Sequence, residues 1–426
     1  MGSELNATKV VADLADLARR ASRTLIAVGA EERAQALVKI AEEIEASVIE
    51  ILAANKNDME RAAKEGMAES MQDRLLLTED RIKAIANGAR QVSKLPNPLG
   101  KTLKENTLPN GLHLKQITVP FGVVGMVYEA RPNVTVDAAV ILLMSGNAAL
   151  LRGSSSADAS NKVLVNVMRR ALGKTAISPE VIQLIPSDDR STVHALLNAR
   201  GKVDLVIPRG SSNLIRTVVD ESTVPTIETG AGVCHVYVDE YADLAKALPI
   251  VLNSKTHRPS VCNAAETLLV HESIAEKFLP VALAALAESK VKLNVDPAVK
   301  KIADELGIKT ELATEENWHT EYNALEMNVG VVPSLLAAAD HIEKYGTKHT
   351  EAIVTDNEDN ANRFVALSDC AAVMVNASTR FTDGEQMGFG AEIGISNQKL
   401  HARGPMGLEQ MTTTTWIVTG TGQVRV

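Results

Sequence analysis

Residues 123–153 read VVGMVYEARPNVTVDAAVILLMSGNAALLRG, and this stretch decides the fold class of the chain. Apolar residues fill 123–128, a helical stretch follows at 134–145, and a second apolar strand follows at 148–151. Short apolar strands separated by helices are typical of a parallel sheet with helices on both faces. We therefore predict an α/β fold in which ligands bind at the carboxyl ends of the strands.

The same alternation continues toward the C-terminus and divides into two series. The first series runs up to a glycine-rich segment, Gly230-Ala-Gly232, and the second begins directly after it. This division predicts a Rossmann-like sheet domain followed by a second α/β domain. Further strands are expected at 181–185, 203–207 and 224–227 in the first series, and at 234–238, 267–270, 352–354 and 372–376 in the second.

Two stretches outside these series predict a small β element. Residues 112–119 alternate in the period of a strand but have no strong apolar face, and residues 412–419 are rich in threonine. A strand of this kind needs a partner, so we expect the two to pair and to join copies of the chain into a homo-oligomer. The predicted domains are 1–110 with 120–229, 230–411, and the β element 111–119 with 412–426.

Composition excludes several classes of function. The chain has 426 residues, 45% of them hydrophobic and 23% charged, which suits a globular protein of two or three domains. A net charge of −9 with 5 Phe, 5 Tyr and 2 Trp argues against a nucleic-acid partner. No apolar run approaches the roughly 20 residues that span a bilayer, and residues 1–17 lack a signal-peptide core. We predict a cytoplasmic location and no membrane partner.

Cys262 is the first candidate for chemistry, within the segment SKTHRPSVCNAAE at 254–266. Lys255, His257 and Arg258 precede it closely, and nearby cations favour the nucleophilic thiolate. A half-buried structural cysteine remains the alternative. Cys234 and Cys370 adjoin apolar strands and are predicted to be core residues. The 9 histidines show no metal-binding spacing, so no metal site is predicted.

Two strand-to-helix turns are candidates for anion binding. They read LRGSSS at 151–156 and IPRGSS at 207–212, and each presents backbone amides at a helix start beside an arginine. The alternative is that these serines only cap helices. Neither the Gly-x-Gly-x-x-Gly fingerprint nor a Gly-x-x-x-x-Gly-Lys loop is present.

Two further polar residues stand at strand ends. Glu228 closes a predicted strand and is either a general base or a turn residue. Asn133 begins a helix and either donates to an oxyanion or caps the helix. The residues alone leave both pairs of alternatives open.

Several long segments resemble the aldehyde dehydrogenase superfamily, and within it the branch that reduces gamma-glutamyl phosphate. The resemblance runs over nearly the whole chain. It rests on PFGVVGMVYEARPNV at 120–134, SGNA at 145–148, LRGS at 151–154, NASTRFTDG at 376–384, GFGAEIGIS at 388–396 and HARGPMGL at 401–408.

The resemblance implies an activity and its participants. We expect reduction of gamma-glutamyl phosphate to glutamate 5-semialdehyde with NADPH, with release of phosphate and a thioacyl intermediate on a cysteine. This reaction is the second step of proline biosynthesis from glutamate, so a separate glutamate 5-kinase is the expected functional partner. A hydrolytic semialdehyde dehydrogenase and an inactive nucleotide-binding scaffold remain the alternatives.

The resemblance also implies roles for individual residues. Cys262 matches the nucleophile, Asn133 the oxyanion donor, and Glu228 the base that precedes the thiol by 34 residues. Arg152 stands where many relatives carry Lys in Lys-Pro-Ser, and a guanidinium suits the 2′-phosphate of NADP(H). The expected cofactor contacts are Arg152, Ser154, Gly210, Ser211 and Glu321. The expected substrate contacts are Arg258, Arg380 and Arg403.

Overall fold

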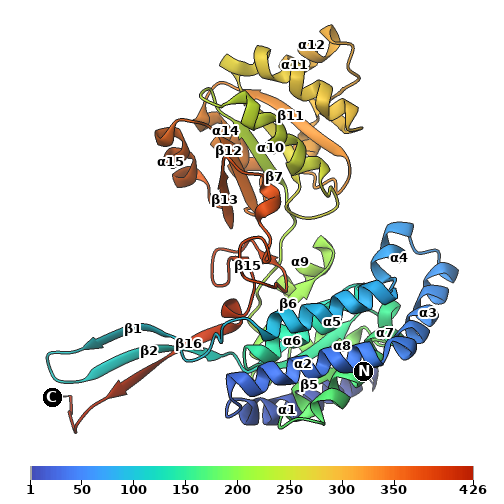
Figure 1. Ribbon diagram of the computed structural model, residues 1–426, viewed down its shortest axis with the longest axis vertical. Helices are drawn as coiled ribbons and strands as arrows, with labels where there is room; N and C mark the ends of the chain where they lie inside the picture. Colours follow the sequence, from blue (N-terminus) through green and yellow to red (C-terminus); the bar gives the residue numbers. More distant parts are fainter. Residues whose placement is uncertain (1, 426) are drawn as a thin grey trace. The chain divides into compact units, whose positions relative to one another are not determined.

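The computed structural model describes residues 2–425, and its backbone contacts divide them into two compact units (Figure 1). Unit 1 comprises the chain up to Glu228, the segment Gly388–Gly394 and the chain from Met406 onward, and unit 2 comprises Thr229–Met387 and Ile395–Pro405. Residues 388–394 and 406–411 therefore lie in unit 1, whereas the sequence assigned them to the second domain. The two segments pair with each other, because Ile393 N–H donates to the Met406 carbonyl at 2.9 Å.

The sheet of unit 1 has four parallel strands, and its order decides where a ligand can bind. The chain starts at a central strand, moves outward over two strands on one side, and then crosses to the other side. The crossing creates a switch point, where parallel sheets place their ligand crevice. The order is β5 (Ile182–Leu184), β4 (Ala148–Gly153), β3 (Val123–Tyr128) and β6 (Leu205–Arg209), with the switch point between β3 and β6.

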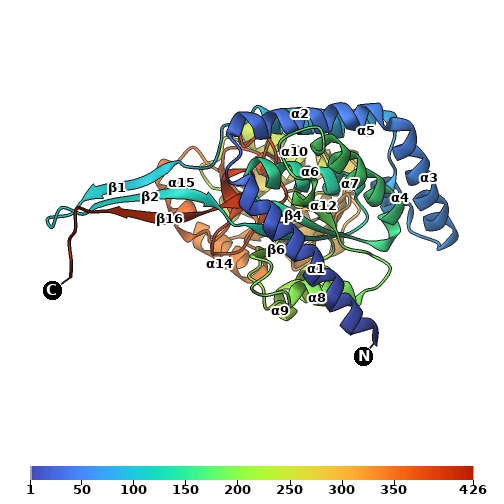
Figure 2. The same ribbon diagram turned by 90° about the horizontal axis from the view of Figure 1, so that it is seen from below.

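Helices cover both faces of this sheet, so every residue of β3 and β4 is buried (Figures 1 and 2). One face is covered by α1 (Gly2–Leu25) and α8 (Ser191–Leu197). The other face carries α6 (Pro132–Met144) and α7 (Asp158–Leu172), and over these lie α2 (Ala30–Ala46), α3 (Val48–Lys64) and α5 (Glu79–Ser93), with α4 (Glu69–Leu75) beside α3. Helix α9 (Ser212–Glu221) follows β6.

One predicted strand of unit 1 does not form. Within 224–227 only Thr226 pairs with the sheet, as a single bridge to Val206. Pro225 has no N–H to continue a hydrogen-bond ladder, although its carbonyl accepts from Val206 N at 2.9 Å. The segment therefore leaves the sheet after one residue and leads into unit 2.

Unit 2 is built on a parallel sheet of seven strands with helices on both faces. Its two apolar cores lie on opposite sides of the sheet. One side is covered by α10 (Leu244–Thr256), α11 (Glu272–Glu288) and α12 (Pro297–Glu305), and the other by α14 (Leu335–Tyr345) and α15 (Glu358–Leu367). The strand order is β10 (Glu311–Leu312), β9 (Lys292–Val295), β11 (Glu326–Val332), β8 (Ala265–His271), β7 (Cys234–Val238), β12 (Thr350–Val354) and β13 (Ala372–Val375).

The predicted β element is present and has one strand more than expected. β16 (Thr412–Thr419) pairs antiparallel with β2 (His113–Pro120), which confirms the predicted pairing. β1 (Thr102–Thr107) adds a third strand on the other side of β2. In Figure 2 the three strands extend away from the helices of unit 1. Leu103 and Trp416 are half exposed, so the sheet presents apolar surface to solvent.

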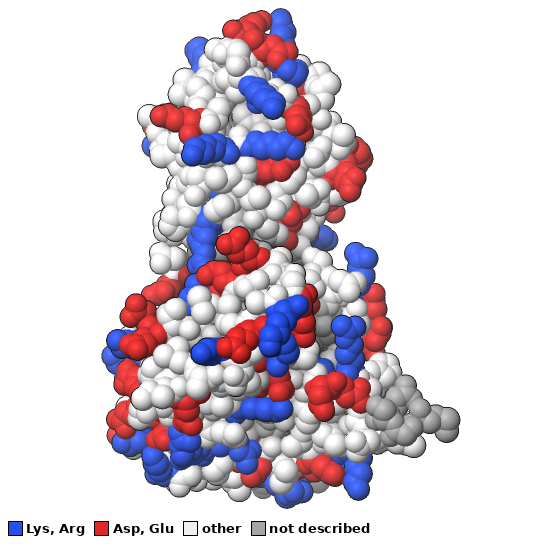
Figure 3. All heavy atoms as spheres, turned by 90° about the vertical axis from the view of Figure 1, so that its right-hand side faces the viewer, with Lys and Arg blue, Asp and Glu red and all other residues white. Residues whose placement is uncertain are grey.

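Charged side chains of both signs are interspersed on the face shown in Figure 3. Ion pairs also join helices of unit 1, since Arg170 of α7 lies 2.6 Å from Glu43 of α2 and 2.5 Å from Glu50 of α3. Among the described helices, none combines the length and apolar character that crossing a bilayer requires.

Candidate active site

Cys262 lies half-buried in the loop between α10 and β8. A hydrogen bond fixes the backbone of this loop, because the Cys262 carbonyl oxygen accepts from Cys234 Sγ at 3.3 Å. Gly232 packs against the same oxygen so closely that a Cβ at this position would lie 1.5 Å from it. Glu321 Oε1 in turn accepts from Gly232 N at 2.9 Å. The chain thus fixes the backbone of Cys262, and the residue as a whole is half-buried.

The cations around Cys262 differ in part from those that the sequence suggested. Arg380 interacts electrostatically with the Cys262 thiol and with Arg258, and its Nε donates to His257 Nδ1 at 3.4 Å. Burial lowers the pKa of Arg380, and its guanidinium is nevertheless the natural partner for a thiolate here. Of the three predicted substrate arginines, Arg380 therefore interacts electrostatically with the candidate nucleophile, and Arg258 interacts with Arg380.

Lys255, the third cation expected beside the thiol, instead points into the core. Its Nζ lies 2.5 Å from Glu266 Oε2, and both side chains are 0% exposed. Burial raises the pKa of Glu266 to about 8 although the ammonium opposes that shift, and the same burial lowers the pKa of Lys255. This pair joins the end of α10 to the start of β8, the two elements that hold the Cys262 loop.

Replacing Lys255 by methionine should lower the free energy of unfolding by about 3–5 kcal/mol, because Glu266 loses its buried counter-charge. Chemical denaturation measures the loss. The double variant Lys255→Met/Glu266→Leu should recover most of it, since an apolar pair has no charge to desolvate. Lys344→Met is the matched control, because Lys344 pairs with Glu315 at 2.7 Å on the surface and should matter far less. If Lys255→Met and Lys344→Met lowered the free energy of unfolding equally, this account would be contradicted.

Arg403, the remaining predicted substrate arginine, belongs to a different cluster of charges. It lies 2.8 Å from Asp369, which also pairs with Lys348 at 3.2 Å and Lys399 at 2.9 Å. Hydrogen bonds from these three cations hold the pKa of Asp369 well below its usual range. Asp369 therefore remains ionised and holds the guanidinium of Arg403 by a hydrogen bond.

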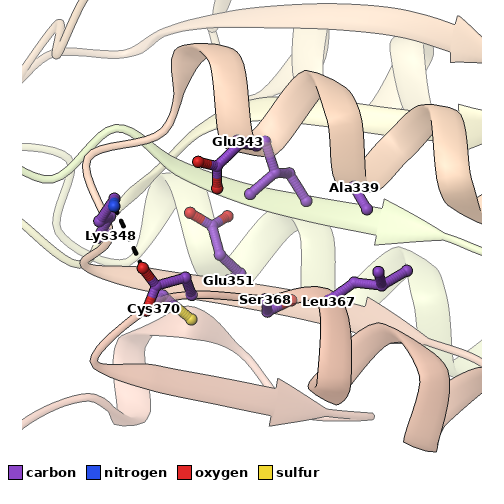
Figure 4. Close-up of a pocket in the computed structure, with 9 residues that line it drawn as sticks. Ala339, Glu343, Lys348, Glu351, Leu367, Ser368 and Cys370 are labelled. Atoms are coloured by element: carbon purple, nitrogen blue, oxygen red, sulfur yellow. Dashed lines mark hydrogen bonds and ion pairs between the residues drawn. The ribbon is translucent and has the colours of Figure 1, made fainter. Parts of the chain in front are cut away.

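Neither of the other cysteines has the surroundings of a nucleophile. Cys234 is fully buried, as predicted, and burial raises its pKa well above the usual value. Cys370 is half-buried, so its prediction as a core residue was wrong: it follows α15 in a loop and lines a small pocket with Lys348 and Glu351 (Figure 4). Burial raises its pKa to about 12, which keeps the thiol protonated.

Asn133 and Glu228 belong to unit 1. Asn133 follows Pro132 in the first turn of α6, and its Nδ2 donates to Asp137 Oδ2 at 2.9 Å, which fixes the orientation of the amide. Burial raises the pKa of Asp137 to about 6. Sequence reasoning missed Asp137, although its place one helical turn after Asn133 was a usable signal. Glu228 is half-buried and is the last residue of the first segment of unit 1.

The turn after β4 uses Arg152 to hold its own backbone. Arg152 is 5% exposed and donates to Thr192 Oγ1 at 3.1 Å, the Gly153 carbonyl at 2.6 Å and the Asp189 carbonyl at 3.2 Å. Ser154 Oγ is hydrogen-bonded to Ser156 Oγ. Arg152 thus sits beneath the turn, with most of its donors already engaged.

A second cation lies on the outside of the same turn. Arg61 of α3 donates to the carbonyls of Ser155 at 2.7 Å and Ser156 at 3.0 Å, and its side chain is 39% exposed. No pattern in the sequence links α3 with this turn, so Arg61 was missed. Nearby Asp58 is fully buried and accepts from the amides of Ala159 and Ser160. The start of α7, predicted as an anion site, is therefore occupied by a carboxylate of the chain.

The turn after β6 also binds a carboxylate of the chain. Ser211 caps α9 through Oγ, which accepts from Leu214 N at 3.4 Å. Glu129, at the end of β3, accepts from Ser211 N at 2.7 Å and from Ser211 Oγ at 2.9 Å. Gly210 and Ser211 are exposed. Ser211 therefore caps its helix, and the same helix start also binds an anionic group, the carboxylate of Glu129. Capping and anion binding, given as alternatives for this turn, occur together.

Within residues 2–425, no group of three His, Cys, Asp or Glu side chains is arranged to hold a metal ion. Glu321, predicted to contact the cofactor ribose, lies in unit 2, and its carboxylate accepts from the backbone of Gly232, a contact that supports the Cys262 loop.

Comparison with known proteins identifies a consistent set of relatives. The sequence model of the aldehyde dehydrogenase family matches residues 4–302. A gamma-glutamyl phosphate reductase of Thermobifida fusca is 54% identical over 415 residues, covering 97% of this chain and 98% of the relative. A reductase of the same name from Kineococcus radiotolerans is 51% identical over 96% of this chain and 95% of its own length.

A solved structure agrees with these sequence relatives. The crystal structure of gamma-glutamyl phosphate reductase from Thermotoga maritima superposes with a TM-score of 0.95 at 44% identity, covering 98% of this chain and 100% of that one. An acetylating aldehyde dehydrogenase from Geobacillus thermoglucosidasius, at 17% identity, has a TM-score of 0.71 over 99% of both chains and shares the fold.

Proposed function

Because the chain belongs to the aldehyde dehydrogenase family and, within it, to the gamma-glutamyl phosphate reductases, it is an oxidoreductase, and we propose that it reduces gamma-glutamyl phosphate to glutamate 5-semialdehyde. The observation that supports this activity most strongly is the half-exposed Cys262, whose backbone is clamped by Gly232 and Cys234 and whose thiol interacts with Arg380. A clamped thiol beside a guanidinium suits covalent catalysis on an anionic substrate.

In the proposed mechanism the Cys262 thiolate attacks the acyl carbon, and a C–S bond forms while the bond to the phosphate oxygen breaks. Phosphate leaves with the bonding electron pair, so a thioester remains on Cys262. NADPH, when bound, supplies the hydride that reduces the thioester carbonyl. The Asn133 amide and backbone N–H groups stabilise the oxyanion, which then collapses: its C–S bond breaks, the semialdehyde leaves and the thiolate is restored. Glu228 serves as a proton shuttle.

The family uses a nicotinamide cofactor, and we propose NADP(H) for this chain. The residues present fit such a group, since the start of α9 already binds a carboxylate through Ser211, and both Arg152 and Arg61 of α3 contact the backbone of the β4 turn. Arg61 is the more exposed of the two cations and favours a 2′-phosphate at that turn, whereas Arg152 supports the turn from beneath. The residues proposed to hold the cofactor are Arg152, Ser154, Gly210, Ser211 and Glu321.

Arg258 and Arg380 are proposed to bind the phosphate and carboxylate of the substrate, supported by the electrostatic interactions of Arg380 with the Cys262 thiol and with Arg258. Arg403 is assigned to the same role on the resemblance alone. We expect Arg380→Ala to raise KM for the acyl phosphate by about tenfold or more, because an ionic hydrogen bond is worth about 1.5–3 kcal/mol. Steady-state kinetics measures the change, and the Kd for NADPH should stay constant.

The matched control for Arg380 is Arg363→Ala, which removes the same charge from the exposed side of α15. Arg380→Lys should restore part of the affinity, because a cation returns without the bidentate geometry. An Arg380→Ala enzyme with unchanged KM would show that this arginine does not bind the substrate.

Phosphate dependence tests the proposed activity. Run backward, the enzyme should sustain reduction of NADP+ by glutamate 5-semialdehyde beyond a single turnover only when inorganic phosphate is present, since phosphate is the acceptor of the acyl group. A hydrolytic semialdehyde dehydrogenase would reduce NADP+ equally well without phosphate. An inactive scaffold would bind the cofactor and reduce none.

We also propose that copies of the chain associate through the β element. The exposed apolar residues of β16 and the open edges of β1 and β16 support this, because unpaired strand edges and apolar surface favour association. Substrate must come from a phosphorylation of glutamate, so a glutamate 5-kinase is the proposed supplier, and a cytoplasmic location is proposed for both steps.

A further inference from the structure

Glu129 stands at the switch point of the unit 1 sheet, where a cofactor is expected. It directly follows β3, and the residue it contacts, Ser211, follows β6 after one glycine. In a parallel sheet the ligand crevice lies between two neighbouring strands whose following connections run toward opposite edges of the sheet. Neither the sequence pattern nor the proposed mechanism gives Glu129 a role.

The Glu129 carboxylate uses the donors that an anionic ligand would need. One oxygen accepts from Ser211 N at 2.7 Å and the other from Ser211 Oγ at 2.9 Å. The carboxylate also covers Gly210, where an added Cβ would lie 2.6 Å from Glu129 Oε2. A phosphate group therefore cannot reach the start of α9 while Glu129 remains there, because the two anions would share the same donors and repel each other.

Glu129 differs from Asp58, the other carboxylate at a helix start, because Glu129 is accessible enough for a ligand to displace it. Asp58 is 0% exposed at the start of α7 and accepts from two backbone amides, a serine hydroxyl and Arg61. Glu129 is only half-buried, and the helix start that it covers is exposed. Asp58 is thus a permanent cap, whereas Glu129 occupies a surface position that solvent and ligands reach.

We propose that Glu129 is a resident anion that holds the start of α9 in the cofactor-free enzyme and is displaced by the diphosphate of the cofactor. The inference rests on the proposed use of a nicotinamide dinucleotide. Glu129 acts by occupying the donors of Ser211, and its charge makes cofactor binding weaker and more easily reversed.

The test measures binding of NADPH to Glu129→Gln by fluorescence titration. Glutamine keeps an oxygen for Ser211 N but removes the charge, so we expect Kd to fall by about 3–10-fold. Glu221→Gln is the matched control, since it removes the same charge from the other end of α9 and should leave Kd unchanged. Glu129→Asp provides a second variant, because its shorter side chain cannot reach Ser211, and it should also bind more tightly.

Binding of two fragments of the cofactor shows which of its groups is affected by the charge of Glu129. 2′-Phospho-ADP-ribose contains the diphosphate and should show the same gain in Glu129→Gln, whereas adenosine 2′-phosphate lacks it and should show none. An unchanged or raised Kd for NADPH in both variants would overturn the inference, as would an equal gain for adenosine 2′-phosphate. If the unaltered enzyme bound no nicotinamide dinucleotide, the proposed function itself would fail, which this series distinguishes.

Discussion

Replacing Cys262 by serine is expected to lower kcat by more than about a thousandfold, the scale seen when a covalent nucleophile is removed. A serine hydroxyl is a much weaker acid and a poorer nucleophile than a thiol, so the acyl intermediate should form far more slowly. The Kd for NADPH should change by less than about twofold, because the residues proposed to hold the cofactor do not include Cys262 and the substitution removes no charge that the cofactor needs. Stopped-assay turnover and fluorescence titration measure the two quantities.

Cys370→Ser is the matched control for this experiment. Cys370 is also half-buried in unit 2, but burial raises its pKa to about 12 and no step of the mechanism uses it. Its replacement should leave kcat within about twofold, as expected for a side chain outside the reacting groups. A Cys262→Ser enzyme that kept a tenth of the original kcat would remove the basis of the mechanism.

Gly232→Ala is expected to lower kcat by at least about a hundredfold, because a shift of about 1 Å in a reacting group has that effect. A Cβ at this position would lie 1.5 Å from the Cys262 carbonyl oxygen and 2.5 Å from its carbon, and backbone atoms cannot move aside as a flexible side chain could. The loop that carries the thiol must therefore shift. Turnover is the measurement, with circular dichroism to confirm that the variant folds.

Gly88→Ala gives the contrast. Gly88 lies within α5, and a Cβ there would meet nothing within 4 Å. Alanine has the higher helix propensity, so this variant should gain about 0.5–1 kcal/mol of stability and keep full activity. If the Gly232→Ala enzyme were as active as the Gly88→Ala enzyme, the close approach of Gly232 to the Cys262 loop would not matter for catalysis.

The sequence predicted most reliably those elements whose composition is uniform. β3 was predicted at 123–128, where the structure has it, because an uninterrupted apolar run has one favourable place in a covered sheet. β11 was missed because polar residues interrupt it. Asn328 in this strand is fully buried, and its Nδ2 donates to the Asn317 carbonyl at 2.8 Å. Such a partner is supplied by the fold, and a pattern of apolar residues does not reveal it.

The candidate site shows the same limit. Cys262 could be singled out from its polar loop, and Arg380 through a family resemblance, but the contact of Arg380 with His257 joins residues 123 positions apart. Lys255 was misjudged, because closeness in sequence to Cys262 suggested a role that its burial with Glu266 excludes. Glu129 and Asp58 were missed altogether, since a carboxylate at a helix start is recognised only when the chain has brought the two together.

Acyl transfer to Cys262 can be observed most directly with glutamate 5-semialdehyde and NADP+ in the absence of phosphate. The thioester then forms but has no acceptor, so rapid acid quenching should show one NADPH per active site and one glutamyl group on the peptide that contains Cys262. Addition of phosphate should remove that group and start continuous turnover. Continuous NADPH formation without phosphate, with residue 262 unmodified throughout, would contradict the account.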